Sequence, residues 1–266
     1  STLCYGGAEM DIIIWIIAGA LLPWFPFSWI FNRLLVSAPG AWARALTVIV
    51  LPQLGLLLLL KSGAWYVLGQ EMPTALRALA LFTAIFYAYR AAGTRDVQIW
   101  ARFMATSGLS LTWLLVGLLP QHWDMQLFVL AWSIPAALML IWAGVLTKKT
   151  GASYLGLSGG FARVLPRLSV LISLTALAAT ATPIFPNFFA LLQAMESLPI
   201  IWMPLLLLVL LLWGWTVGRL LQDLLFGIYH GDAVHDLSVA GTWLGGLTLG
   251  VFALVGIFWG GIWIIN

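Results

Sequence analysis

Two apolar stretches long enough to cross a membrane each contain a close pair of prolines, Pro23 with Pro26 and Pro183 with Pro186. A proline has no backbone N–H and displaces the carbonyl one turn earlier, so each pair frees peptide groups inside the hydrocarbon. Transporters use such broken helices to bind ions or substrates near the bilayer midplane. The alternative is a kink packed against a neighbouring helix, and the proline spacing is compatible with both interpretations.

Neutral polar residues accompany these prolines in the apolar stretches. Ser28 follows the first proline pair, and Asn187 follows the second. Thr47 and Gln53 lie in the apolar stretch that comes directly after the first pair. Together with the free backbone groups, these side chains are candidates for the lining of a polar pathway. For Gln53 the alternative is a hydrogen bond from its amide to a neighbouring carbonyl, which needs no pathway.

Ionisable residues are confined to the ends of the apolar stretches, and none of Lys, Asp, Glu or His falls at a predicted midpoint. A charge at the bilayer centre is costly and is retained where it has a function. The loop that carries His230, Asp232, His235 and Asp236 could bind a metal or collect protons, but loop residues beside a glycine are ordinarily solvated. Three separated histidines and one cysteine form no recognisable zinc or haem site. We therefore expect no metal and no cofactor.

The composition excludes a water-soluble globule. Hydrophobic residues make up 62% of the chain and charged residues 8%, whereas about 25% is usual for soluble domains. A spanning helix needs roughly 20 residues, so 266 residues accommodate eight or nine spans and no further domain. The net charge of +3 is no argument for a nucleic-acid partner. We predict one transmembrane domain over residues 1–266, an all-α polytopic bundle of about eight helices, two of them broken by prolines.

Charged residues and Pro/Gly clusters set the boundaries of the spans. The predicted spans are 11–31, 43–60, 74–92, 99–119, 126–147, 165–192, 199–226 and 239–265. This arrangement puts ten of the twelve Lys and Arg residues on one side and leaves only Lys61 and Arg77 on the other. Because Lys and Arg accumulate in cytoplasmic loops, we predict a protein of the bacterial inner membrane with both termini on the non-cytoplasmic side.

Several segments resemble motifs of one family, in the same order along the chain. They are Leu21–Ser28 with the later Ala38-Pro39, Asp96-Val97-Gln98, Gly151 with Gly159–Arg167, the broken sixth span, Arg219–Gln222 with Leu225-Phe226-Gly227, and Asp236-Leu237-Ser238. They are similar to motifs of the antiporter-like subunits, the proton-translocating membrane subunits of respiratory complex I, related hydrogenases, Mrp sodium/proton antiporters and inorganic-carbon uptake complexes. The resemblance implies that this chain corresponds to the seventh to fourteenth helices of that fold.

The same resemblance implies that the proton relay is missing. Where the family carries titratable relay residues, this chain has Leu21, Ser28, Gln98, Trp132 and Ala136, with Thr47 or Gln53 at the position on the second span. Leucine, tryptophan and alanine cannot carry a proton. The resemblance therefore implies an antiporter-like subunit that is structural or accessory to a catalytic proton-translocating partner.

Two classes of function remain open from the sequence. The first is this accessory subunit, whose partners would be a full-length antiporter-like subunit, other subunits of the complex and lipids. The second is an autonomous small transporter or channel that uses the two broken helices. An enzyme is not expected, since no nucleophile and base share a predicted depth. The pairs Gly245-Gly246 and Gly260-Gly261 in the last span favour close packing onto another subunit.

Overall fold

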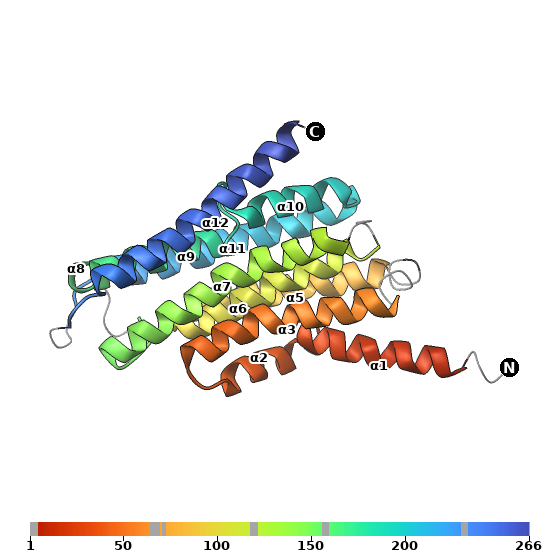
Figure 1. Cartoon of the computed structure of the whole chain (residues 1–266), viewed down its shortest axis with the longest axis horizontal. Coiled ribbons are helices and arrows are strands. Elements are labelled where there is room, and N and C mark those ends of the chain that lie inside the picture. The colour runs from red at the N-terminus through yellow and green to blue at the C-terminus, as the bar shows by residue number, and fades with distance from the viewer. Residues whose placement is uncertain are drawn as a thin grey trace.

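The computed structural model describes residues 5–63, 70, 73–117, 122–155, 160–229 and 234–265 of the chain. Within these ranges every regular element is a helix, and the one β-type pairing is an isolated bridge between Asp96 and Tyr154. The helices run side by side along the long axis of the molecule (Figure 1). The prediction of an all-α membrane bundle is therefore confirmed.

The first half of the chain forms the lower part of the bundle in Figure 1. Its helices are α1 (Tyr5–Leu21), α2 (Ser28–Ser37), α3 (Gly40–Ser62), α5 (Pro73–Gly93) and α6 (Val97–Ser110), which continues as the 3₁₀ helix η1 (Leu111–Leu115). The second half contains α7 (His122–Thr150), α8 (Phe161–Val164), α9 (Pro166–Ala179), α10 (Pro186–Ser197), the 3₁₀ helix η2 (Ile200–Trp202), α11 (Met203–Leu225) and α12 (Val239–Ile265).

The helices follow the eight predicted spans. Five are long and apolar enough to cross a membrane singly, and they lie in α3, α5, α7, α11 together with η2, and α12. The fourth predicted span is α6 with η1, and the first and sixth are the helix pairs α1/α2 and α9/α10. Pro23 and Pro26 lie between α1 and α2, and Pro183 lies between α9 and α10. Pro186 instead occupies the first turn of α10, where a missing N–H costs no hydrogen bond.

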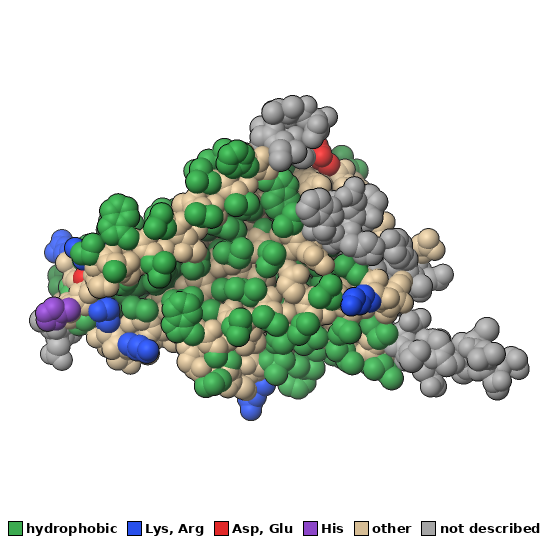
Figure 2. Space-filling view, in the orientation of Figure 1, with side chains coloured by type: hydrophobic (Ala, Val, Ile, Leu, Met, Phe, Trp, Pro, Cys, Tyr) green, Lys and Arg blue, Asp and Glu red, His purple; other side chains and the backbone are tan. Residues whose placement is uncertain are grey.

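Helix α6 with η1 forms the centre of the bundle, and residues 103–116 are all buried. It packs against α5 and α7, while α7 also packs against α3 and α9, and α5 against α11. Large apolar side chains cover the outside of the bundle (Figure 2), as on α12, where Leu244, Leu247, Val251 and Phe258 are exposed. An apolar exterior is the surface that lipid tails require.

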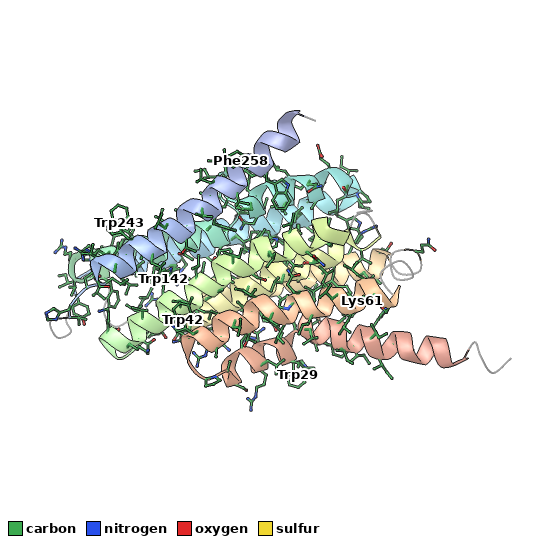
Figure 3. All side chains as sticks on the ribbon, in the orientation of Figure 1. Trp29, Trp42, Lys61, Trp142, Trp243 and Phe258 are labelled. Carbon is green, nitrogen blue, oxygen red and sulfur yellow. The ribbon has the colours of Figure 1, made fainter. Side chains whose placement is uncertain are left out.

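One end of the bundle is basic. In the face drawn in Figure 2, most Lys and Arg atoms lie toward the end where α8 lies. Lys61 lies at the opposite end, whereas the outward-facing Trp42 and Trp243 lie toward the α8 end (Figure 3). Helix α1 begins and α12 ends on the side away from α8 (Figure 1). The chain therefore crosses the bundle an even number of times.

The last helix uses two of its predicted packing glycines within the chain. A Cβ at Gly245 would meet the Trp142 ring at 2.8 Å, and one at Gly260 would collide with the Phe189 ring. Of the four predicted glycines, Gly246 has open space around it, and the surroundings of Gly261 are not described. The prediction that these glycines pack onto another subunit is therefore wrong for Gly245 and Gly260, because bulky side chains of α7 and α10 already occupy the space.

Gly55 on α3 packs directly against the first helix break. A Cβ there would lie 3.0 Å from the Leu22 backbone nitrogen and 3.3 Å from the Ala18 carbonyl oxygen. We predict that Gly55→Leu lowers the free energy of unfolding by about 2 kcal/mol, because it pushes α3 away from the break. An SDS titration of the purified protein in detergent, followed by tryptophan fluorescence, measures this change.

Gly214→Leu on α11 is the matched control, since a Cβ there meets nothing within 4 Å. It should change the stability by less than about 0.5 kcal/mol. Equal losses for the two variants would contradict tight packing at Gly55.

Candidate functional site

The first helix break is closed by groups from other helices. The Phe25 N–H donates to Thr83 Oγ1 on α5 at 3.0 Å, and the Trp113 indole on η1 donates to the Leu22 carbonyl at 3.1 Å. Thr83 and Trp113 are buried. A peptide group left unpaired in hydrocarbon costs several kcal/mol, so these two side chains are what make the break tolerable. Sequence reasoning missed both, because they lie far from the prolines in the chain.

A small neutral cluster continues from the break into α2. Tyr87 Oη donates to Ser28 Oγ at 3.2 Å, and Asn32 Nδ2 donates to the Ser28 carbonyl at 3.1 Å and to Thr106 Oγ1 at 2.9 Å. These bonds tie α2 to α5 and α6. The cluster consists of hydroxyl groups and one amide, and it contains no carboxylate, imidazole or amine.

A second neutral cluster joins α6 to α5 and α11. The Trp213 indole donates to Ser107 Oγ at 2.8 Å, and Ser107 Oγ donates to the Ala84 carbonyl at 2.7 Å. Ser110 Oγ donates to the Ser107 carbonyl at 2.8 Å. The Trp132 ring fills the adjacent space, lying against Gly108 and 4.8 Å from the Trp213 ring centroid. Where the resemblance places a titratable residue, the structure thus has a packed indole.

The second break is covered by α10 and α12. Asn187 is fully buried, and its side-chain amide donates to the Ala178 carbonyl at the end of α9. Its Oδ1 is buried and has no hydrogen-bond partner among the described residues. On the other side, Gly256 of α12 packs against the Ile184 carbonyl so closely that a Cβ there would clash. The α12 side of the break is therefore covered by protein, while Pro183 and Ile184 are exposed.

The two remaining predicted pathway residues form ordinary helix contacts. Thr47 Oγ1 donates to the Ala43 carbonyl of its own helix at 2.7 Å. Gln53 Nε2 donates to the Gln126 carbonyl of α7 at 3.0 Å, the bond that needs no pathway. In the part of the chain that the structure describes, no hydrogen bond connects Ser28, Thr47, Gln53 and Asn187 to one another.

No Lys, Arg, His, Asp or Glu side chain is fully buried among the described residues. Apart from the Tyr87 phenol and the indoles, every buried polar side chain in the described ranges belongs to a serine, threonine or asparagine. The same ranges contain no group of three His, Cys, Asp or Glu residues that could hold a metal. His230 and Asp232 lie outside the described residues. Asp236 has a structural contact, since its carboxylate accepts from the backbone N–H groups of Arg167 and Leu168 at the start of α9.

A cavity of about 120 Å³ lies at the basic end, and its wall includes Arg44, Asp96, Gln98 and Arg102. Arg44 donates to Gln98 Oε1 at 2.7 Å, and the Gln98 amide donates to Thr147 at 3.1 Å. Asp96 is the N-cap of α6 and accepts from the Gln98 and Ile99 N–H groups. The charges here are held at the helix ends and do not continue into the neutral interior.

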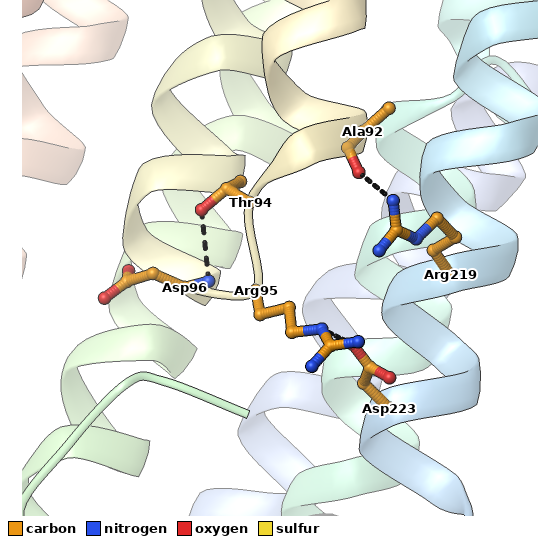
Figure 4. A network of polar contacts seen from close by, with 6 residues as sticks. All are labelled: Ala92, Thr94, Arg95, Asp96, Arg219 and Asp223. Atoms are coloured by element: carbon orange, nitrogen blue, oxygen red, sulfur yellow. Dashed lines mark hydrogen bonds and ion pairs between the residues drawn. The ribbon is translucent and has the colours of Figure 1, made fainter. Parts of the chain in front are cut away.

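Three of the family-like segments, those near Gly160, Arg219 and Asp236, make contacts at this basic end. Gly160 packs against the Gly227 carbonyl so closely that a Cβ would clash, and the Phe161 and Tyr229 rings lie 5.4 Å apart. Arg219 donates to the Ala92 carbonyl at 2.7 Å (Figure 4). The segments near Gly160, Arg219 and Asp236 therefore fasten α5, α9, α11 and α12 together, which is a structural role.

Comparison with solved structures agrees with this arrangement. A chain of respiratory complex I from Thermus thermophilus matches 91% of this chain and 53% of its own length, with a TM-score of 0.77 and 19% identity. This chain therefore has the antiporter-like fold. A chain of the archaeal membrane-bound sulfane sulfur reductase matches 91% of this chain and 52% of its own length, with a TM-score of 0.77 and 16% identity.

The third comparison extends the likeness to the Mrp complex. A chain of that complex from Dietzia sp. DQ12-45-1b matches 98% of this chain and 57% of its own length, with a TM-score of 0.75 and 13% identity. This chain therefore spans about half the length of the solved chains with the antiporter-like fold. Neither a protein-family model nor a curated protein sequence matches it. The resemblance seen in the sequence is confirmed for the fold.

Closure of the first break gives a direct test. Thr83→Val keeps the side-chain shape and removes the acceptor of the Phe25 N–H, so we predict a loss of about 2 kcal/mol in the free energy of unfolding. The SDS titration in detergent measures it. Thr47→Val is the matched control, because that hydroxyl donates only within its own helix, and its effect should stay below about 0.5 kcal/mol. A loss at Thr47 as large as that at Thr83 would contradict this assignment.

Proposed function

We propose that this chain is a membrane subunit of a proton-motive-force-coupled complex, antiporter-like in fold but without a titratable relay. It acts as a structural or accessory partner of a subunit that translocates protons. The observation that supports this proposal most strongly is the neutral interior, since no Lys, Arg, His, Asp or Glu side chain is fully buried among the described residues.

Proton transfer through apolar helices needs groups that bind and release a proton. Carboxylates, imidazoles and amines serve as such groups in membrane proton relays, whereas aliphatic hydroxyls and amides do not titrate in the physiological range. Several hydroxyls and amides of this chain donate to neighbouring carbonyls or hydroxyls, as Ser107 does to Ala84 and Asn32 to Thr106. Groups bonded in this way hold helices together.

An autonomous transporter or channel would instead need free polar groups at the broken helices. At the first break, Thr83 and Trp113 already bond the Phe25 N–H and the Leu22 carbonyl. The family-like segments that remain serve to hold helix ends, as Asp236 does for α9. Retention of the fold without a relay fits a subunit whose task is assembly.

The membrane and its orientation belong to the same proposal. We infer a bacterial inner membrane with the basic end of the bundle facing the cytoplasm. That orientation follows the bias of Lys and Arg toward cytoplasmic loops, and it leaves both chain termini outside the cytoplasm.

Purification from native membranes tests the proposal. A tagged chain, solubilised in mild detergent, should co-purify with a larger antiporter-like chain in a fixed ratio, and mass spectrometry identifies that partner. Isolation as a homo-oligomer that moves ions in liposomes would support the autonomous transporter and overturn the subunit proposal.

A pair of substitutions tests whether any pathway crosses the interior of this chain. In the intact complex, Ser28→Ala and Asn187→Leu should each change the rate of proton transport by less than about twofold, because neither residue transfers a proton. Transport is measured with a pH-sensitive dye in liposomes and normalised to the amount of assembled complex. The positive control is substitution of a titratable relay residue in the partner chain. A large loss of transport at Ser28 or Asn187 with assembly intact would contradict a passive interior.

A further inference from the structure

A groove runs along the outside of the bundle between α5 and α11. Its volume is about 500 Å³, within the range of roughly 300–1,000 Å³ for ligand pockets. Leu211, Leu212 and Trp215 of α11 line one wall, and Tyr89 and Gly93 of α5 line the other. Trp215 and Tyr89 are 62% and 70% exposed. The groove is therefore apolar over most of its length and open to whatever surrounds the bundle.

Two arginines lie at the basic end of this groove. Arg90 is in the last turn of α5, and Arg219 is eight residues, or roughly 12 Å, beyond Leu211 on α11. The Arg90 guanidinium carbon lies 4.4 Å from the centroid of the Phe103 ring, which fixes one side of it. One donor of Arg219 is bonded to the Ala92 carbonyl (Figure 4). Both arginines are exposed, so their remaining N–H donors can bind a ligand.

Neither arginine has a carboxylate partner among the described residues. The carboxylate one turn from Arg219 is Asp223, and it is engaged by Arg95, whose Nε lies 3.3 Å from its Oδ2. Figure 4 shows that pair beside the contact between Arg219 and Ala92. Arg90 and Arg219 thus place two guanidinium groups without a carboxylate partner at the basic end of an apolar groove. This arrangement is complementary to an anion that carries an apolar tail. A phosphate group matches the forked donors of arginine.

We propose that this groove binds an anionic phospholipid. The phosphate lies between Arg90 and Arg219 at the basic end, and an acyl chain lies against Leu211, Leu212 and Trp215. Basic pockets between transmembrane helices are the usual setting for anionic headgroups, and the aromatic side chains of Tyr89 and Trp215 suit the headgroup layer. Neither arginine is neutralised by a carboxylate of the described residues, so the groove favours an occupant that brings its own negative charge.

Native mass spectrometry of the purified protein, with any chains that co-purify, tests the site by titration with phosphatidylglycerol and with phosphatidylcholine. The wild type should retain phosphatidylglycerol in preference. Arg90→Gln with Arg219→Gln should weaken this binding roughly 30-fold, which corresponds to about 1 kcal/mol per arginine. Gly93→Phe should weaken it too with both arginines intact, because a side chain there enters open space at the groove wall.

The control removes the same amount of charge elsewhere. Arg33→Gln with Arg163→Gln, both exposed positions outside the groove, should leave phosphatidylglycerol binding unchanged. An equal loss in this control, or no loss in the groove variants, would overturn the site. Equal competition by glycerol 3-phosphate would identify a soluble anion in place of a lipid. Binding that appears only after the partner chains are stripped would identify a partner helix as the occupant, and either result refutes the proposal.

Discussion

Hydrocarbon offers no water to a backbone N–H or C=O, so the peptide groups freed at each helix break in this bundle need a hydrogen-bond partner from the protein. Thr83 and Trp113 close the first break, and Asn187 bonds across the second. Gly55 and Gly256 let α3 and α12 approach these breaks at backbone distance. The positions of α5, η1, α10 and α12 around the bundle therefore depend on the peptide groups that the breaks expose.

The same constraint explains the division of polar chemistry in the molecule. Inside, some serine and asparagine side chains tie helices together, as Ser107 does by donating to the Ala84 carbonyl, while Trp132 packs against Gly108. At the basic end, the charged residues cap or join helix ends, as Asp96 does for α6 and Arg95 with Asp223. These contacts hold the fold together without any proton-carrying residue, which is the physical basis of the accessory role proposed above.

Much of the fold could be predicted from sequence, because apolar run length and charged boundaries report directly on the bilayer. The breaks were predictable only in part. Pro52 and Pro135 lie inside unbroken helices, whereas Pro23 and Pro26 accompany a break, and what distinguishes them is the tertiary surroundings. The bond from Gln53 to α7 was foreseen as one alternative. Thr83 and Trp113 were missed, and Gly245 was assigned to another subunit, because their neighbours come from distant helices.

Proton flux through this polypeptide alone is the most direct test of its neutral interior. The purified chain, reconstituted without partners into liposomes that contain a pH-sensitive dye, should pass protons under an imposed membrane potential no faster than protein-free liposomes do. An added protonophore must then collapse the gradient. Flux above the empty-liposome rate that saturates with pH and scales with the amount of protein would reveal a titrating group inside the bundle and contradict a passive subunit.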